Sequence, residues 1–176
     1  SEKGGKWFVS IFIEEQSQES HSKEIVGVDL GVARLATLSN GVVIENIHKA
    51  DRTKKAVRKI KKLQKELSRK QKGSNNRAKV KERLKKAHYR LSSIREDHLH
   101  KASTMLTKNH SLIVLENLKV KNMVKKGGSR KRGLNRVMHQ SALGEFVRVL
   151  EYKGQRYGSN IIFVHPAYTS QTCSDC

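Results

Sequence analysis

Two carboxylates, Asp29 and Glu116, each follow a run of apolar residues typical of a buried β-strand. Asp29 lies near the end of IVGVDLG, between Gly27 and Gly31, and Glu116 ends SLIVLE, directly before Asn117. A carboxylate in such a run carries a desolvation cost unless it is paired, hydrogen-bonded or bound to a metal. An Asp that caps a strand and bonds the following turn is the alternative for Asp29 alone. Because two runs end in the same way, we expect the two carboxylates to share a site.

Carboxylates at one edge of neighbouring strands can hold divalent cations, and two such ions can drive phosphodiester hydrolysis by activating water and stabilising the leaving oxygen. Mg²⁺ is the expected ion, because the ligands are hard oxygens and a substrate phosphate fills the remaining positions. Such a site usually needs a third carboxylate, and the sequence offers no clear candidate. Asp51 and Asp97 fall in or beside basic helices, and Asp175 lies between two cysteines.

Other potential metal ligands are Cys and His residues. Cys173 and Cys176 have the spacing of half a tetrahedral zinc site, whose second pair would lie beyond the end of this sequence. A redox pair and two inert thiols are the alternatives. His98, His100 and His110 cluster near the end of a predicted helix, where packing or solvent exposure is favoured because no carboxylate or Cys completes a ligand set.

The charge balance indicates a polyanionic partner. The chain of 176 residues carries 37 Lys and Arg against 16 Asp and Glu, a formal net charge of +21 that would make the folded state repel itself. Nucleic acid is the expected partner. Binding to a membrane surface would need large apolar residues opposite the charges, and aromatic residues make up only 5%. No apolar run approaches the ~20 residues of a membrane span, and no signal peptide is visible, so we expect an intracellular, cytoplasmic protein, nucleoid-associated when bound to DNA.

The elements that must position the carboxylates are short strands. KWFVSIFIE at 6–14 predicts a strand, and a polar stretch to Lys23 predicts a linker. Three apolar runs at 25–30, 35–38 and 42–47 predict an antiparallel meander, with Asn-Gly in a tight turn before the third.

A basic helical hairpin is predicted next. Apolar residues recur in steps of three and four from Ala56 to Leu67 and from Val80 to His98, and the Gly73–Asn76 interruption separates two long helices. Glu residues that could pair with the cations at i,i+4 are scarce, which favours phosphate contacts over a merely solvated surface. The candidate contacts are Lys54, Lys55, Arg58, Lys61, Lys62, Arg69, Lys70, Arg77, Lys81, Arg83, Lys85 and Lys86.

After the hairpin, SLIVL at 111–115 predicts a central strand covered on both faces. A basic glycine-containing loop, a helix over 137–157 and a buried strand at 160–164 follow. The order β-β-β, helical insertion, β, α, β indicates an α/β fold. Further candidate nucleic-acid contacts in the loop and near the C-terminus are Lys125, Lys126, Arg130, Lys131, Arg132, Arg136, Tyr168, Ser170 and Gln171.

Four segments together carry a resemblance to a known family. They are GVDLGV at 27–32, IVLENL at 113–118, LEYKGQRYG at 150–158 and VHPAYTSQTCSDC at 164–176. These segments closely resemble the TnpB family, the OrfB-type RNA-guided nucleases encoded by insertion sequences and related to the type V CRISPR effectors. The match extends over nearly the whole chain from Glu24 onward.

The resemblance implies an RNase H-like RuvC domain, a mixed sheet interrupted by the long basic helical hairpin, with a zinc ribbon in complete members. It implies that Asp29 and Glu116 are catalytic and bind Mg²⁺, and that Cys173 and Cys176 are the first pair of Zn²⁺ ligands. The third catalytic Asp and the second Cys pair would lie beyond Cys176. A guide RNA would select target DNA by base pairing, while the protein contacts backbone and duplex shape.

The resulting domain prediction divides the chain into five parts. We expect the end of a preceding wedge-type β domain and a linker at 1–23, the first RuvC part at 24–50, the hairpin at 51–110, the second RuvC part at 111–167 and the start of a truncated zinc ribbon at 168–176. Three functions are weighed: a fragment of an RNA-guided DNA endonuclease, an inactive RNA- or DNA-binding module or regulator derived from one, and a basic structural RNA-binding protein. The first is favoured, because the third would not require carboxylates at strand ends.

Overall fold

The computed structural model describes residues 1–14, 24–118, 133, 135, 138 and 141–165. The chain forms two compact units, each described here by itself: unit 1 comprises Ser1–Glu15 and Ile47–His98, and unit 2 comprises Gln16–Asn46 and Leu99–Cys176. Nearly all of the predicted basic loop and the whole Tyr168–Cys176 segment lie outside the described residues. The domain boundaries drawn from the sequence remain predictions.

The predicted meander opens the sheet of unit 2 and is confirmed. Strand β3 (Ile25–Leu30) pairs antiparallel with β4 (Arg34–Leu38), which pairs antiparallel with β5 (Val43–Glu45). The turn between β4 and β5 contains Gly41 at φ +85°, a backbone conformation that favours glycine, and the Gly41 N–H donates to the Leu38 carbonyl. The third strand is shorter than predicted, because the chain enters a short 3₁₀ helix, η1 (Ile47–Lys49), directly afterwards.

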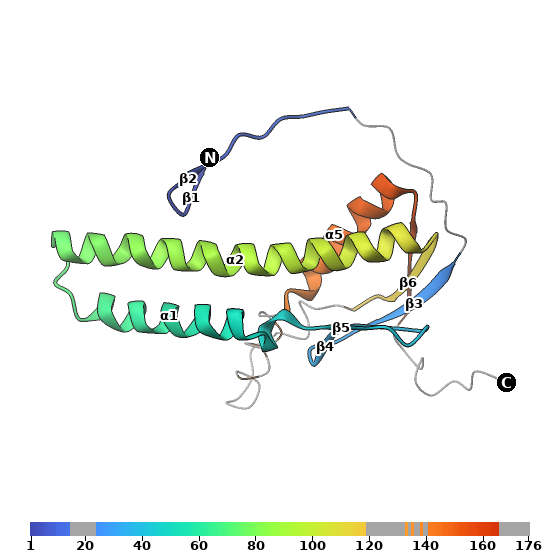
Figure 1. The fold of residues 1–176 in the computed structure, drawn as a ribbon, viewed down its shortest axis with the longest axis horizontal. Helices are drawn as coiled ribbons and strands as arrows, with labels where there is room; N and C mark the ends of the chain where they lie inside the picture. Colours follow the sequence, from blue (N-terminus) through green and yellow to red (C-terminus); the bar gives the residue numbers. More distant parts are fainter. Residues whose placement is uncertain (15–23, 119–132, 134, 136–137, 139–140, 166–176) are drawn as a thin grey trace. The chain divides into compact units, whose positions relative to one another are not determined.

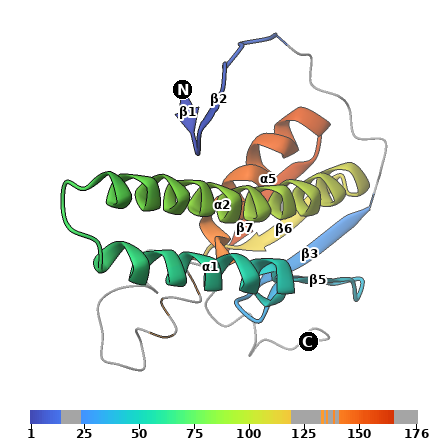
Figure 2. The ribbon, with the colours of Figure 1, turned by 60° about the vertical axis from the view of Figure 1, so that its left-hand side comes forward.

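Two parallel strands complete the sheet. Strand β6 (Leu112–Glu116) lies parallel to β3 and to β7 (Asn160–Val164), so that the described residues form a mixed five-stranded sheet in the order β5-β4-β3-β6-β7. Figure 2 shows β3 and β6 running side by side. The α/β class predicted from the sequence is therefore confirmed as a mixed sheet with long helices.

The core of unit 2 lies on one face of this sheet. Val26, Val28, Ile113 and Leu115 alternate along β3 and β6 and are almost completely buried. They belong to one apolar cluster with residues from the last turns of α2 (Asn75–Asn109) and from α5 (Leu143–Tyr157), among them Leu99, Leu106, Phe146 and Leu150. The helix predicted over 137–157 is confirmed from Leu143 onward.

The opposite face of the sheet is more open, which corrects two predictions. Within the described residues, β6 is buried on one face only, with Leu112 and Val114 half-buried, and β7 is largely exposed, with Ile162 48% and Val164 36% accessible. Among the described residues, strand β7 pairs only with β6 and so lies at the edge of the sheet. A continuous apolar run specifies that a strand forms, but it does not specify how many of its faces are covered.

Unit 1 contains the predicted helical hairpin. Helix α1 (Asp51–Ser68) and the first part of α2 lie side by side (Figure 1) and join through Ile60, Leu63, Ala87 and Leu91 in a small apolar cluster. Both helices and the break between them are confirmed. In the described part of the chain, no helix is both long and apolar enough to cross a membrane.

The strand predicted at 6–14 is wrong for most of its length. Only Lys6–Trp7 forms a strand, β2, which pairs with β1 (Glu2–Lys3), while the rest of the segment through Glu14 has no regular structure. Its apolar side chains are exposed: Val9 is 87% accessible and Phe12 fully accessible. Strand propensity became a strand only where a partner strand was available for pairing, as expected if propensity depends on context.

Candidate functional site

Asp29 and Glu116 lie next to each other at the carboxyl ends of two parallel strands. Val28 of β3 is in register with Leu115 of β6, so the next position on each strand brings Asp29 level with Glu116. Adjacent strands are roughly 4.8 Å apart, and residues in register share a face. The two carboxylates therefore lie on the same face and can approach within the range that a divalent cation bridges.

This shared face is the one opposite the core. Asp29 is exposed and Glu116 is half-buried, whereas Val28 and Leu115 before them are buried. The desolvation reasoning that first singled out Asp29 is thus corrected, because the side chain points out of the core. The strand register brings the two carboxylates together. Because both side chains are at least partly accessible, a ligand can reach them.

The turns that follow the two carboxylates are held by hydrogen bonds. After Asp29, the Gly31 N–H donates to the Leu35 carbonyl over 3.3 Å, and the side-chain amide of Asn46, which is 2% exposed, donates to the Val32 carbonyl over 3.3 Å. After Glu116, the Asn117 N–H donates to the Val164 carbonyl over 2.9 Å. These hydrogen bonds therefore hold the backbone next to Asp29 and Glu116 in place.

Sequence reasoning missed two residues of this edge. Thr37 of β4 is the cross-strand partner of Asp29 and shares its face, and Asn46 anchors the turn after Asp29. The meander itself could have revealed Thr37, because the register of an antiparallel pair aligns residues across it. No sequence signal distinguished Asn46 from an exposed turn residue.

A third acidic ligand is not found beside the pair within the described ranges, where no group of three His, Cys, Asp or Glu residues forms a potential metal site. Asp51 begins α1 and Asp97 lies in α2, both in unit 1. Asp175, Cys173 and Cys176 lie outside the described residues, so the zinc half-site remains a prediction.

Two of the clustered histidines have contacts within unit 2. His110 is 5% exposed, and its Nδ1 lies 3.0 Å from the Leu106 carbonyl. His100 is exposed, with its Nδ1 3.2 Å from the Tyr152 hydroxyl. His98 is half-buried on α2 in unit 1. The contacts of His100 and His110 are those of helix packing and helix ends.

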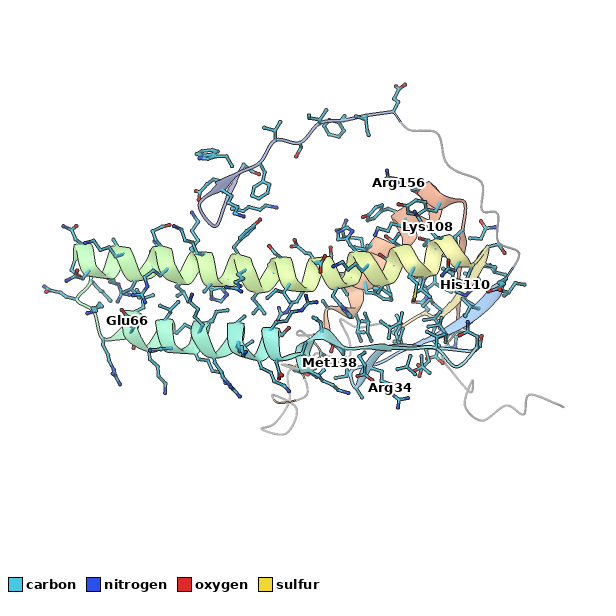
Figure 3. The ribbon with its side chains drawn as sticks, viewed as in Figure 1. Arg34, Glu66, Lys108, His110, Met138 and Arg156 are labelled. Atoms are coloured by element: carbon cyan, nitrogen blue, oxygen red, sulfur yellow. The ribbon has the colours of Figure 1, made fainter. Side chains whose placement is uncertain are left out.

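Most predicted phosphate contacts on the hairpin are exposed. Three of them form ion pairs within unit 1: Lys54 with Asp51, Arg83 with Glu66 (labelled in Figure 3) and Lys85 with Glu2. Exposed ion pairs of this kind contribute little to stability, so a phosphate can replace them.

Arg77 has a different role at the end of the hairpin. Its guanidinium donates to the carbonyls of Leu67 and Lys70, over 2.6 and 3.1 Å, and so satisfies the open C-terminal end of α1. Both hydrogen bonds use Nη1 of the guanidinium, and the phosphate contact predicted for Arg77 stays a prediction. The predicted contacts in the Lys125–Arg136 loop and at Tyr168, Ser170 and Gln171 lie outside the described residues.

A positive field surrounds the start of the hairpin. Burial lowers the pKa of His48, and the neighbouring cations Lys49, Arg95 and Lys54 lower it further. Burial also lowers the pKa of the Arg95 guanidinium. The neighbouring cations therefore disfavour the charged form of His48, and an anion placed beside it would favour that form.

Comparison with known families decides the classification. The model of the OrfB_IS605 family, described as probable transposase, matches residues 8–127, which is more than half of the chain. The chain belongs to this family. The model of the Cas12f1-like TNB domain matches residues 144–176. The resemblance to TnpB proteins inferred from the sequence motifs is confirmed.

Several curated proteins are similar over most of the chain. The Escherichia coli K12 protein named "Putative RNA-guided DNA endonuclease InsQ" is 42% identical over the whole chain and 46% of its own length. A Streptomyces pristinaespiralis protein named "Putative RNA-guided DNA endonuclease" is 34% identical over 99% of the chain and 42% of its own length. A "TnpB-like protein" of Acanthamoeba polyphaga mimivirus is 28% identical over 58% of the chain and 20% of its own length. The chain spans less than half the length of these relatives.

Proposed function

We propose that this OrfB_IS605 family chain provides part of an RNA-guided DNA endonuclease that cleaves phosphodiester bonds with carboxylate-bound metal ions. The observation that carries the proposal is the pair Asp29 and Glu116, in register on adjacent parallel strands and on the accessible face of the sheet. The names of the relatives support the substrate class, since two of them are named "Putative RNA-guided DNA endonuclease" or "Putative RNA-guided DNA endonuclease InsQ".

The fold proposed for this site is the RNase H-like RuvC domain. The mixed sheet supports it in two ways. First, the carboxyl ends of the parallel strands β3, β6 and β7 lie at one edge of the sheet. Second, β3 lies between β4 and β6: the chain passes from β3 to β4 on one side of it, and after the helical hairpin it forms β6 on the other side. Ligands of open α/β sheets commonly bind outside the carboxyl ends of the strands at such a switch point.

The donor set fits a hard divalent cation. Two carboxylates on one accessible face suit Mg²⁺, which keeps several waters and binds through one or two carboxylates plus substrate phosphates. When bound, the ions would activate the attacking water and stabilise the leaving oxygen. Asp29 and Glu116 would hold them, Asn46 and the β4 pairing would keep Asp29 in place, and the third carboxylate would come from outside the described residues.

The nucleic-acid partners proposed are a guide RNA and its target DNA. Exposed cations among the contacts predicted on the hairpin, together with those of the Lys125–Arg136 loop, would lie along the guide or the heteroduplex and contact backbone rather than bases. For Cys173 and Cys176 we propose Zn²⁺ binding, with a second pair of ligands in the complete protein, because their spacing is that of half a tetrahedral site.

Cleavage by carboxylate variants tests the proposal. The protein is purified with the RNA that it retains, that RNA is sequenced, and cutting of complementary DNA is followed with and without Mg²⁺. Asp29→Asn and Glu116→Gln should each lower the cleavage rate on the order of 100- to 1,000-fold, because metal binding contributes several kcal/mol to the transition state. The control Asp51→Asn removes an exposed carboxylate of α1 and should cut at the normal rate. Undiminished Mg²⁺-dependent cutting by both site variants would overturn the assignment.

A binding module derived from such a nuclease is the second candidate. It is favoured by one observation, that only two carboxylates meet at the site within the described residues. It predicts salt-sensitive nucleic-acid binding by the wild-type protein and no cleavage even at high Mg²⁺.

A further inference from the structure

A groove in unit 1 runs between α1 and the first part of α2. It has a volume of about 740 Å³, and its lining among the described residues contains six cationic side chains and two alanines but no acidic residue. The lining residues are Arg52, Lys55, Ala56, Lys59, Arg83, Lys86, Ala87 and Arg90. Three of its cations, Arg52, Lys59 and Arg90, were not among the contacts predicted from the sequence.

The cations form two matched rows. On α1 they stand at Arg52, Lys55 and Lys59, and on α2 at Arg83, Lys86 and Arg90, which is the same spacing of three and then four residues on both helices. This spacing keeps each row on one side of its helix. At 1.5 Å per residue each row is about 10 Å long, roughly the axial length of three nucleotides of one strand in a duplex.

The sides of the groove carry charged side chains, and the residues at its base have small side chains. Ala87 is 7% exposed and belongs to the apolar cluster that joins the helices, and Ala56 packs against the same cluster. Larger side chains at these two positions would fill the space between the rows. The arrangement leaves a channel that a chain of phosphates can enter.

Most of the groove cations are available for a ligand. Arg83 pairs with Glu66 over 3.2 Å, but that ion pair is exposed, with the Arg83 side chain 60% accessible. Lys55, Lys59 and Arg90 form no ion pair with any residue in the described part of the chain. Like charges facing each other across the groove repel, so an anion between them is stabilised from both walls.

The chemistry of the groove selects its occupant. Lys and Arg side chains are hydrogen-bond donors without acceptors. A phosphodiester backbone presents acceptor oxygens at every nucleotide. The backbone of an acidic peptide also presents N–H donors, for which Lys and Arg side chains offer no acceptor. The groove therefore matches a phosphodiester better than a polypeptide.

We propose that this groove, the Arg52–Arg90 groove, is the site where the hairpin holds the sugar–phosphate backbone of one nucleic-acid strand, independently of sequence. The inference rests on the nucleic-acid partner of the proposed function, but not on cleavage. It assigns the binding to one side of the hairpin, although cations cover most of its surface.

The test compares two triple variants with equal loss of charge. The groove variant is Lys55→Gln, Lys59→Gln and Arg90→Gln. The control is Lys65→Gln, Lys72→Gln and Lys79→Gln, three exposed residues of the same hairpin that lie outside the groove lining and outside the contacts predicted from the sequence. Fluorescence anisotropy measures binding of a labelled single strand of about 20 nucleotides, as RNA and as DNA, in EDTA and over a series of KCl concentrations. Circular dichroism checks that both variants remain helical.

The expected result is a difference in both affinity and salt dependence. The groove variant should bind at least about tenfold more weakly, and the slope of log K against log salt should fall by about 2, since each phosphate contact in a single strand contributes roughly 0.7. The control should change affinity less than about threefold. RNA and DNA should respond alike, because both offer the same phosphodiester.

Two outcomes would overturn the inference. Equal losses in the two triple variants would mean that overall charge, and not the groove, holds the strand. Polyglutamate binding that is as tight as RNA binding, and lost in the groove variant alone, would assign the groove to an acidic polypeptide. Because EDTA prevents metal-dependent cutting, these results do not depend on whether the cleavage proposal holds.

Discussion

At the scale of single residues, the candidate site depends on backbone register. Asp29 and Glu116 could be selected from the sequence because each ends a strand-like run, but their shared face depends on the alignment of Val28 with Leu115. Sequence alone could not supply that alignment, since about eighty residues separate the two runs, most of them in the helical hairpin. Asn46 was missed for a related reason: nothing local indicates that its amide turns inward to the Val32 carbonyl.

Asn46→Ala should destabilise the protein by about 1–3 kcal/mol, because it removes the side-chain amide whose hydrogen bond the Val32 carbonyl accepts. Urea unfolding followed by circular dichroism measures the change. Asn40→Ala is the matched control, since Asn40 is an exposed turn residue whose Oδ1 accepts from the Val42 N–H, and it should cost less. Equal costs for the two variants would contradict the anchoring role of Asn46.

Gly154 of α5 is a position where a side chain does not fit. A Cβ there would lie 2.7 Å from the Ser159 carbonyl oxygen and 2.9 Å from Cγ1 of Ile161. Gly154→Ala should therefore lower the free energy of unfolding by about 1–3 kcal/mol, although alanine favours helix. At Gly144 in the same helix a Cβ would meet nothing within 4 Å, so Gly144→Ala should lower stability by no more than about 0.5 kcal/mol. Thermal melts of the pair give the comparison, and a stabilised Gly154→Ala protein would contradict the close packing of α5 on β7.

At the scale of elements, periodicity identified the long helices and the central strands. The steps of three and four through Ile60 and Leu63 correctly indicated an apolar stripe, and the Asn-Gly pair at Asn40 correctly marked a hairpin turn. The pattern of apolar residues did not predict the structure of segments whose pairing or burial depends on other parts of the chain. The 6–14 segment formed only two residues of strand, and β7 proved exposed, because neither pairing nor coverage is encoded within the segment itself.

The contact between α5 and α2 within unit 2 includes a buried lysine. Lys153 is 6% exposed, and its Nζ donates to the His100 carbonyl and to the Thr104 hydroxyl. Burial lowers the pKa of Lys153, with a smaller effect of Arg156 in the same direction. The folded protein therefore binds this proton less tightly than the unfolded chain does.

The sign of the pH dependence follows from that shift. Below the lowered pKa the charged lysine costs stability, and the cost disappears as pH rises toward the ordinary value of 10.5. The free energy of unfolding of the wild type, minus that of Lys153→Met, should thus increase between about pH 7 and pH 10. Urea melts of both proteins at each pH measure it, and the subtraction cancels the other titrating groups. A difference that stays constant or falls with pH would show that the lysine is not desolvated.

At the scale of the whole molecule, two functions are assigned to different units. Unit 1 carries the basic hairpin with its groove, and unit 2 carries the carboxylate pair. Composition predicted the polyanionic partner without predicting either location, since a net charge of +21 says nothing about where the charge gathers. Binding and cutting should therefore be separable: groove variants should weaken binding, and carboxylate variants should slow cutting.

The central claim is that Asp29 and Glu116 hold a divalent metal ion. In a chain with so large a positive charge, a divalent cation is repelled from most of the surface, so the place where it binds is informative. Mn²⁺ added to the isotopically labelled chain broadens the NMR signals of nearby amides. We predict broadening confined to the edge formed by Asp29, Thr37 and Glu116, and its loss in the Asp29→Asn, Glu116→Gln double variant. Broadening that persists in that variant, or that appears only elsewhere, would contradict the account.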